Sequence, residues 1–456
     1  MPEHKSKAMT RREFVRAAVA GTAFAAAANI ANGSASQRRR PNVLFILADD
    51  LGYGDLSSFG RPDYRTPHLD RLAQQGLRFA NAYSASPVCT PTRCAFITGR
   101  YPARTPVGLE EPLAFRKNLG DKVTVLGLSP EHPTIASLLR QNGYQTALVG
   151  KWHLGYLPTF GPIQSGFEEF FGIMSGGVDY FSHKDALGEA DLFEDKVPVE
   201  RIGYLTDLLT ARAVEVIRRR RTRPFYLSLH YTAPHWPWEG REDVEVSRRI
   251  GEGLGNFTGG GSLKTYAAMM KSLDDGVGRV LRALRSARLE RDTLVIFTSD
   301  NGGERFSYNW PFTGKKFELR EGGIRVPAMI RWPGVIPAGR TTGQVAVTMD
   351  WTATILAATR TTPDANYPLD GEDLLSVCTG ARAVYERKLF WRHDKQDAVR
   401  HGNWKYFNEG QKEYLFDLSA DQREQADFKE QRPEIFQQLR GEFQSWQTQV
   451  LPRPGT

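Results

Sequence analysis

The fold of this chain follows from the stretch Val43-Leu44-Phe45-Ile46-Leu47-Ala48-Asp49-Asp50. Six consecutive apolar residues, β-branched and aromatic ones among them, have the length and composition of a strand buried on both faces. Such strands belong to parallel sheets that helices cover on both sides. The two aspartates follow the strand directly, so we expect their carboxyl groups at the carboxyl end of a central strand.

Strands and helices continue to alternate along the chain. Further strands are predicted at residues 146–149, 225–230 and 294–298, and helices at residues 133–143, 205–218 and 263–284. This alternation predicts an α/β fold with a large, mostly parallel sheet flanked by helices. From about residue 380 the segments become short and aromatic-rich, which predicts a small antiparallel sheet, and residues 431–449 predict a closing helix.

Polar side chains gather just after the predicted strands. Each of the following lies within a few residues of a strand end: Asp49, Asp50, Lys151, His153, His235, Asp300 and Asn301. In a parallel sheet these ends share one edge, where ligands bind. A single aspartate pair after a strand is usually a turn or a helix cap. Two such groups of oxygen donors instead favour a site for Ca²⁺ or Mg²⁺, because carboxylate and amide oxygens are hard ligands.

A cysteine opens a short predicted helix at residues 89–98. Pro91 fits its first turn and Gly99 its end, so Cys89 faces unpaired backbone donors at a point that would welcome an anion. Most cysteines are small apolar fillers, and a thiol beside a hard cation is a chemical mismatch. An oxygen nucleophile at position 89 would instead suit a hard cation.

The pattern Cys89-x-Pro91-x-Arg93, followed by Thr98-Gly99, resembles the signature of the type I sulfatases. Within that family the chain resembles the arylsulfatases and N-acetylgalactosamine-6-sulfatases. Further segments match the family pattern in order, at residues 42–55, 150–155, 233–237, 298–302, 311–327 and 398–418. The resemblance implies an alkaline-phosphatase-like sandwich and a sulfuric ester hydrolase that acts on a sulfated carbohydrate or an aryl sulfate.

The resemblance also implies roles for individual residues. Cys89 would be oxidised to formylglycine and would hold one Ca²⁺, with Mg²⁺ as the second choice, together with Asp49, Asp50, Asp300 and Asn301. The catalytic set would be Cys89, Arg93, Lys151, His153, His235 and Lys316. Counting back from Glu321 in the family pattern selects Lys316 rather than Lys315. A hydroxyl of the formylglycine hydrate would attack sulfur, His235 would protonate the departing oxygen with help from Lys316, and His153 would assist release of sulfate.

Residues 1–35 are predicted to be an export signal. Arg11-Arg12 with Phe14, an alanine-rich run at residues 17–31 and small residues at 33–35 resemble a twin-arginine signal. The run is too short and too weakly apolar for a stable membrane anchor. We therefore expect export by the twin-arginine translocase to the periplasm or the medium of a bacterium, after a formylglycine-generating enzyme has modified Cys89 in the cytoplasm.

Composition limits the remaining possibilities. A net charge of +8 and a pI near 9.3 fit an anionic substrate as well as an ordinary solvated surface, and no nucleic-acid partner is expected.

Residues 36–375 are predicted to form the catalytic domain and residues 376–456 a C-terminal subdomain. A phosphate or phosphonate monoester hydrolase on the same scaffold is the alternative enzyme, and a non-catalytic binding protein a further one. His183 could line the pocket, but we expect it to be exposed.

Overall fold

The computed structural model describes residues 40–110 and 126–454. The predicted signal segment, residues 1–35, lies outside the described residues. Residues from Pro41 onward form one compact unit. The proposed boundary between residues 375 and 376 stays a prediction, and helix α11, Leu375–Thr379, runs across it.

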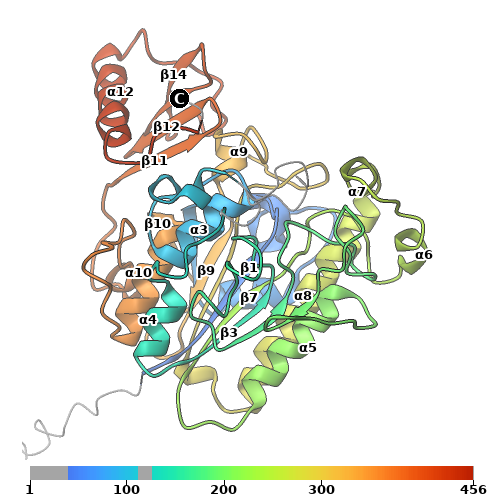
Figure 1. Cartoon of the computed structure of the whole chain (residues 1–456). Coiled ribbons are helices and arrows are strands. Elements are labelled where there is room, and N and C mark those ends of the chain that lie inside the picture. Colours follow the sequence, from blue (N-terminus) through green and yellow to red (C-terminus); the bar gives the residue numbers. More distant parts are fainter. Residues whose placement is uncertain (1–39, 111–125, 455–456) are drawn as a thin grey trace, which may run out of the picture. The chain divides into compact units, whose positions relative to one another are not determined.

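Ten strands form one large mixed sheet in the order β10-β2-β9-β8-β1-β7-β3-β4-β5-β6 (Figure 1). Strand β1, Asn42–Ala48, lies inside it and pairs in parallel with β7, Phe225–His230, and β8, Thr293–Ser299. All seven residues of β1 are buried, as the sequence predicts. The other strands are β2 (Leu77–Tyr83), β3 (Gln145–Gly150), β4 (Glu169–Gly172), β5 (Phe193–Glu194), β6 (Val197–Pro198), β9 (Ala328–Arg331) and β10 (Arg340–Val347). The antiparallel part of the sheet lies around β9 and at the edge formed by β4, β5 and β6.

Two hydrophobic cores lie on the two faces of this sheet. Because successive side chains of a strand point to opposite faces, Leu44 and Ile46 enter one core, and Val43 and Phe45 enter the other. Helices that contribute to the first core are α2 (Pro67–Gln74), α5 (Leu205–Arg218) and α8 (Leu263–Ser286). Helices that contribute to the second are α3 (Cys89–Thr98), α4 (Ile135–Gln141) and α10 (Thr348–Thr359). Figure 1 shows α3, α4 and α10 on one side of the strands and α5 and α8 on the other.

A second, smaller sheet follows the large one. Its antiparallel strands are β11 (Lys388–His393), β12 (Gln396–His401), β13 (Trp404–Asn408) and β14 (Glu413–Asp417), and α12 (Pro433–Gln447) packs against them. The predicted meander and closing helix are confirmed. Short helices α6 (Val244–Ser247), α7 (Leu254–Gly259) and α9 (Glu321–Ile324) complete the fold. Within the described ranges, no helix combines the length and apolar character needed to cross a membrane.

Buried charges join the small sheet to the segment that contains α9. The ammonium of Lys405, on β13, lies 3.0 Å from Glu321 Oε1 and 2.8 Å from Glu424 Oε1, and all three side chains are buried. It also donates to the carbonyl oxygen of Leu319 at 2.7 Å. Burial alone would raise the pKa of Glu321, but Lys405 and Arg325 hold it below its ordinary value. Lys405 therefore contacts both the residues before α9 and the first residue of that helix, and stabilises their position.

Replacing Lys405 with alanine should lower the free energy of unfolding by about 3–5 kcal/mol, because Glu424 would remain buried without its cation and Glu321 would keep only Arg325. The measurement is the urea midpoint. Lys412→Ala, in the exposed connection between β13 and β14, is the control and should leave the midpoint unchanged. Equal losses in the two variants would contradict a stabilising role for this contact.

Candidate functional site

The carboxyl edge of the large sheet gathers the predicted polar residues. β1 ends at Ala48, which pairs with Ser299 at the end of β8, and Gly150 at the end of β3 pairs with His230. Parallel pairing thus brings together strand ends that are far apart in sequence. The structure places all ten predicted site residues here, and each is buried: Asp49, Asp50, Cys89, Arg93, Lys151, His153, His235, Asp300, Asn301 and Lys316.

Three cations neutralise the three carboxylates of the site. Lys151 Nζ lies 2.7 Å from Asp49 Oδ2, and Lys316 Nζ lies 2.8 Å from Asp50 Oδ2. Arg93 Nη2 lies 2.7 Å from Asp300 Oδ2 and 3.4 Å from Asp49 Oδ1. Removing any one partner would leave a buried charge uncompensated.

Burial and neighbouring charges shift the pKa values of these carboxyl groups in opposite directions. Burial and the charge of Asp49 raise the pKa of Asp300 to about 6. Burial would also raise the pKa of Asp50, but the nearby positive charges, that of Lys316 first, outweigh it and lower that pKa. The surroundings thus disfavour the charged form of the Asp300 carboxyl group and favour the charged form of the Asp50 carboxyl group.

Cys89 lies at the first position of α3, directly against the carboxylates. Its Sγ is 3.4 Å from Asp49 Oδ1 and 3.9 Å from Asp50 Oδ1. Burial raises the pKa of the thiol well above its ordinary value, despite the nearby Lys151 and Lys316. A cysteine in this position would be protonated and therefore a weak nucleophile.

The donor set fits a hard cation. Ligand atoms of Asp49, Asp50, Cys89 and His235 all lie within 4.8 Å of one another. Asn301 donates from Nδ2 to Asp50 Oδ1 at 2.7 Å, whereas its buried Oδ1 has no hydrogen-bond partner among the described residues. A buried carbonyl oxygen without a partner is costly, and a cation would satisfy it. Carboxylate and amide oxygens are the ligands that Ca²⁺ prefers.

Two histidines face this cluster as neutral rings. His235 Nδ1 lies 2.6 Å from the carbonyl oxygen of Trp236, which can only accept, so Nδ1 carries the hydrogen. His235 Nε2 is then left facing Asp50 Oδ2 at 3.6 Å. Burial and Lys316 lower the pKa of His235 well below its usual value, and burial and Lys151 do the same for His153. Both rings are therefore available to accept a proton.

The comparisons with known proteins agree with this arrangement. The family model named Sulfatase matches residues 41–361, which is most of the chain. The chain belongs to the sulfatase family. It is an enzyme that hydrolyses sulfate esters, and its sheet and helices form the alkaline-phosphatase-like sandwich that the sequence predicts.

Among its relatives, human N-acetylgalactosamine-6-sulfatase is 33% identical over 393 residues, which cover 82% of this sulfatase and 72% of the human protein. The crystal structure of Ps i-CgsB in complex with k-i-k-neocarrahexaose matches with a TM-score of 0.80 and 29% identity, over 91% of this chain and 94% of that one. The phosphonate monoester hydrolase of Agrobacterium radiobacter shares the fold, with a TM-score of 0.63 and 20% identity over 90% of this chain and 96% of its own.

A loop that the sequence analysis missed packs against both histidines of the sulfatase site. A Cβ atom on Gly176 would lie 2.8 Å from His153 Cε1, and one on Gly177 would lie 3.0 Å from His235 Cε1. The loop therefore fixes two rings that come from different strand ends. The two consecutive glycines, a few residues after β4, were the available signal for it.

Asp191 holds this loop in place. Its carboxylate accepts hydrogen bonds from the backbone N–H groups of Met174 at 3.1 Å and Ser175 at 2.8 Å.

The expectation that His183 is exposed is wrong. Its ring is buried, and its Nε2 lies 3.1 Å from the carbonyl oxygen of Gly203, because the loop around residues 179–191 folds back on itself.

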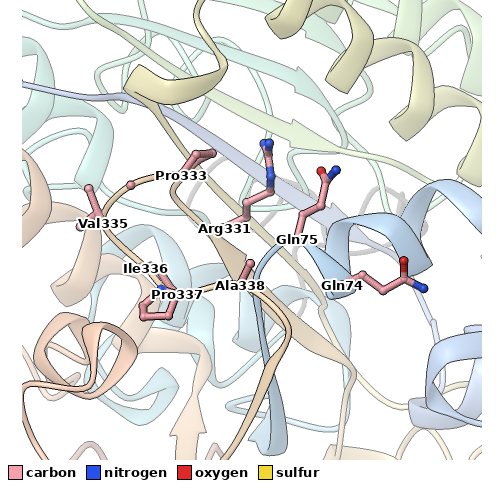
Figure 2. Close-up of a pocket in the computed structure, with 9 residues that line it drawn as sticks. Gln74, Gln75, Arg331, Pro333, Val335, Ile336, Pro337 and Ala338 are labelled. Carbon is pink, nitrogen blue, oxygen red and sulfur yellow. The ribbon is translucent and has the colours of Figure 1, made fainter.

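The hollow in Figure 2 is a separate feature of the sulfatase. It has a volume of about 630 Å³ and is lined by Gln74, Gln75, Arg331 and residues 333–338. These residues lie at the start of β2 and the end of the antiparallel β9, which is the edge of the sheet opposite the site. None of the ten site residues lines it.

Gly176→Ala should reduce kcat on the order of 10²-fold, because the added methyl group must displace the His153 ring and small displacements of catalytic groups have effects of that size. Gly255→Ala is the matched control, since a methyl group there would meet no described atom within 4 Å. Steady-state kinetics and thermal melting of both variants provide the comparison. Normal turnover by Gly176→Ala would show that the loop does not fix the ring.

Proposed function

We propose that this sulfatase hydrolyses a sulfate monoester of a carbohydrate to an alcohol and inorganic sulfate, with formylglycine at position 89 and one bound Ca²⁺. An aryl sulfate is the second substrate class. The observation that carries the proposal is the placement of Cys89 against Asp49 and Asp50, amid hard ligands where a thiol is poorly suited. The relatives named for N-acetylgalactosamine 6-sulfate hydrolysis and for a carbohydrate complex support the sugar class.

Asp49, Asp50, Asp300, Asn301 and residue 89 would hold the cation. When bound, it would lower the pKa of a hydroxyl group among its ligands, which is the activation that a formylglycine hydrate requires. The unpartnered Oδ1 of Asn301, within the described part of the chain, supports this assignment.

The lysines supply the charge that binds the sulfate group. Since Arg93, Lys151 and Lys316 already balance three carboxylates, a bound Ca²⁺ would give the site a charge of +2. A sulfate ester is an anion, so its transfer into the site is favoured. Lys151 and Lys316 would contact the sulfate oxygens and stabilise the charge that develops there, while Arg93 and Lys151 orient residue 89.

His235 would deliver a proton to the departing oxygen from Nε2. Its Nδ1 hydrogen bond to Trp236 fixes the ring, so Nε2 is the atom that exchanges the proton. The low pKa of the ring in the substrate-free site would rise when the sulfate anion lies beside it. Lys316 would assist this step, and His153 would accept the proton whose removal accompanies sulfate release.

A phosphate or phosphonate monoester hydrolase is the alternative, since a phosphonate hydrolase shares the fold. Among the residues that the structure describes, a single cluster of metal-type ligands is found, which suits one cation and favours the sulfatase assignment.

For the N-terminus we propose that residues 1–35 direct twin-arginine export to the periplasm or beyond. We also propose residues 36–375 as catalytic domain and 376–456 as C-terminal subdomain.

Protein produced with a formylglycine-generating enzyme should carry an aldehyde at residue 89, detected by mass analysis of that peptide. Turnover of 4-nitrophenyl sulfate should scale with the aldehyde fraction and exceed turnover of 4-nitrophenyl phosphate. A host without the enzyme supplies the control preparation. Full activity with only thiol at position 89 would overturn the mechanism, and preferential phosphate turnover would select the alternative function.

His235→Ala should lower turnover by about 10²- to 10⁴-fold for a sugar sulfate, because the alkoxide leaving group requires a proton. The loss should be smallest for aryl sulfates with acidic phenols, which leave without one. His183→Ala, at a buried ring of the neighbouring loop, provides a control for general disturbance. Equal losses across all leaving groups would argue against a role as general acid.

A further inference from the structure

Lys316 and Phe317 occupy the middle of a tight turn in which the N–H of Glu318 donates to the carbonyl oxygen of Lys315 at 3.0 Å. Phe317 has a φ of 75°, whereas Lys316 is not in the left-handed region. The turn is therefore of type II, in which glycine usually takes the position of Phe317. A bulky aromatic residue with positive φ is a rare outlier, and such outliers concentrate at ligand sites.

Surrounding segments hold this unfavourable conformation in place. The N–H of Lys316 donates to Gly303 O at 3.2 Å, and the N–H of Phe317 donates to Pro87 O at 3.0 Å. Gln396, on β12 of the small sheet, donates to Phe317 O at 2.8 Å and accepts from Leu319 N at 2.8 Å. The turn is thus restrained from three sides, including the loop that leads into Cys89.

The turn sends its two side chains to different places. The Lys316 ammonium is buried against Asp50, while Phe317 is 52% exposed. The ammonium lies 5.4 Å from the centre of the Phe317 ring and 6.0 Å from that of Trp236. A single exposed aromatic residue is ordinary on a protein surface. Here, however, the ring is held in a strained backbone beside the cation that would bind the sulfate group, and core packing does not offset the strain.

We propose that Phe317 binds the substrate by stacking its ring against the sugar that carries the sulfate group. This inference rests on the proposed function. A sulfate group in contact with Lys316 places the attached ring of the substrate within reach of Phe317. The apolar face of a sugar then covers the exposed aromatic surface, a mode of contact that suits aromatic residues at the rim of binding sites. Phe317 is a binding residue and takes no part in proton transfer.

The test compares Phe317→Ala, Phe317→Gly and Phe317→Tyr in the full chain carrying the aldehyde. The unaltered enzyme is first assayed with N-acetylgalactosamine 6-sulfate and galactose 6-sulfate. The sugar sulfate that it hydrolyses faster is then used for all variants. The Ala and Gly variants should raise KM about 3- to 10-fold with kcat nearly unchanged, and Tyr should restore KM. The inhibition constant of inorganic sulfate should not change, because Lys316 remains. Ile202→Ala, at a fully exposed apolar position, is the control.

Thermal melting separates binding from structure. Phe317→Gly should melt no lower than Phe317→Ala, because glycine adopts the positive φ without strain. An unchanged KM in the Ala and Gly variants would overturn the stacking role and leave the sulfatase function standing. A parallel rise in the inhibition constant of sulfate would also overturn it, since Lys316 would then be misplaced. If the unaltered enzyme hydrolyses 4-nitrophenyl sulfate but neither sugar sulfate, the proposed substrate class falls and this inference falls with it.

Discussion

Burial of three carboxylates at one edge of the sheet is the constraint on which the structure depends. Asp49, Asp50 and Asp300 emerge from strands that are themselves buried on both faces, so water cannot solvate them. Each needs a cation, and α3, the end of β3 and the loop before α9 each supply one. Each of these three elements must therefore lie where its cation can contact a buried carboxylate.

The small sheet belongs to this arrangement more closely than its place at the end of the chain suggests. Lys405 neutralises Glu321, and Gln396 restrains the turn that carries Lys316 and Phe317. Residues of β12 and β13 thus hold the segment from which the site obtains one of its cations. Such support from a second layer explains how a strained turn can persist beside a cluster of buried charges.

Much of the site could be predicted from the sequence. Continuous apolar runs located the central strands, and polar residues after them identified the edge of the sheet where ligands gather. The loop Gly176–Gly177 was missed because it acts by allowing close approach to two histidines, which no local pattern reveals. The exposure of His183 was predicted wrongly, since a polar residue in a loop gives no sign that the loop folds back over it.

The sequence by itself determined the type of fold, the sheet edge that bears the site and the residue types that could bind an anion and a hard cation. These depend on hydrophobic periodicity and side-chain chemistry, which are local properties. Only the tertiary structure decided which carboxylate pairs with which cation, which nitrogen of His235 faces the site and that Phe317 stands beside Lys316. Those outcomes depend on packing and desolvation between residues as distant as Arg93 and Asp300, and no local pattern encodes them.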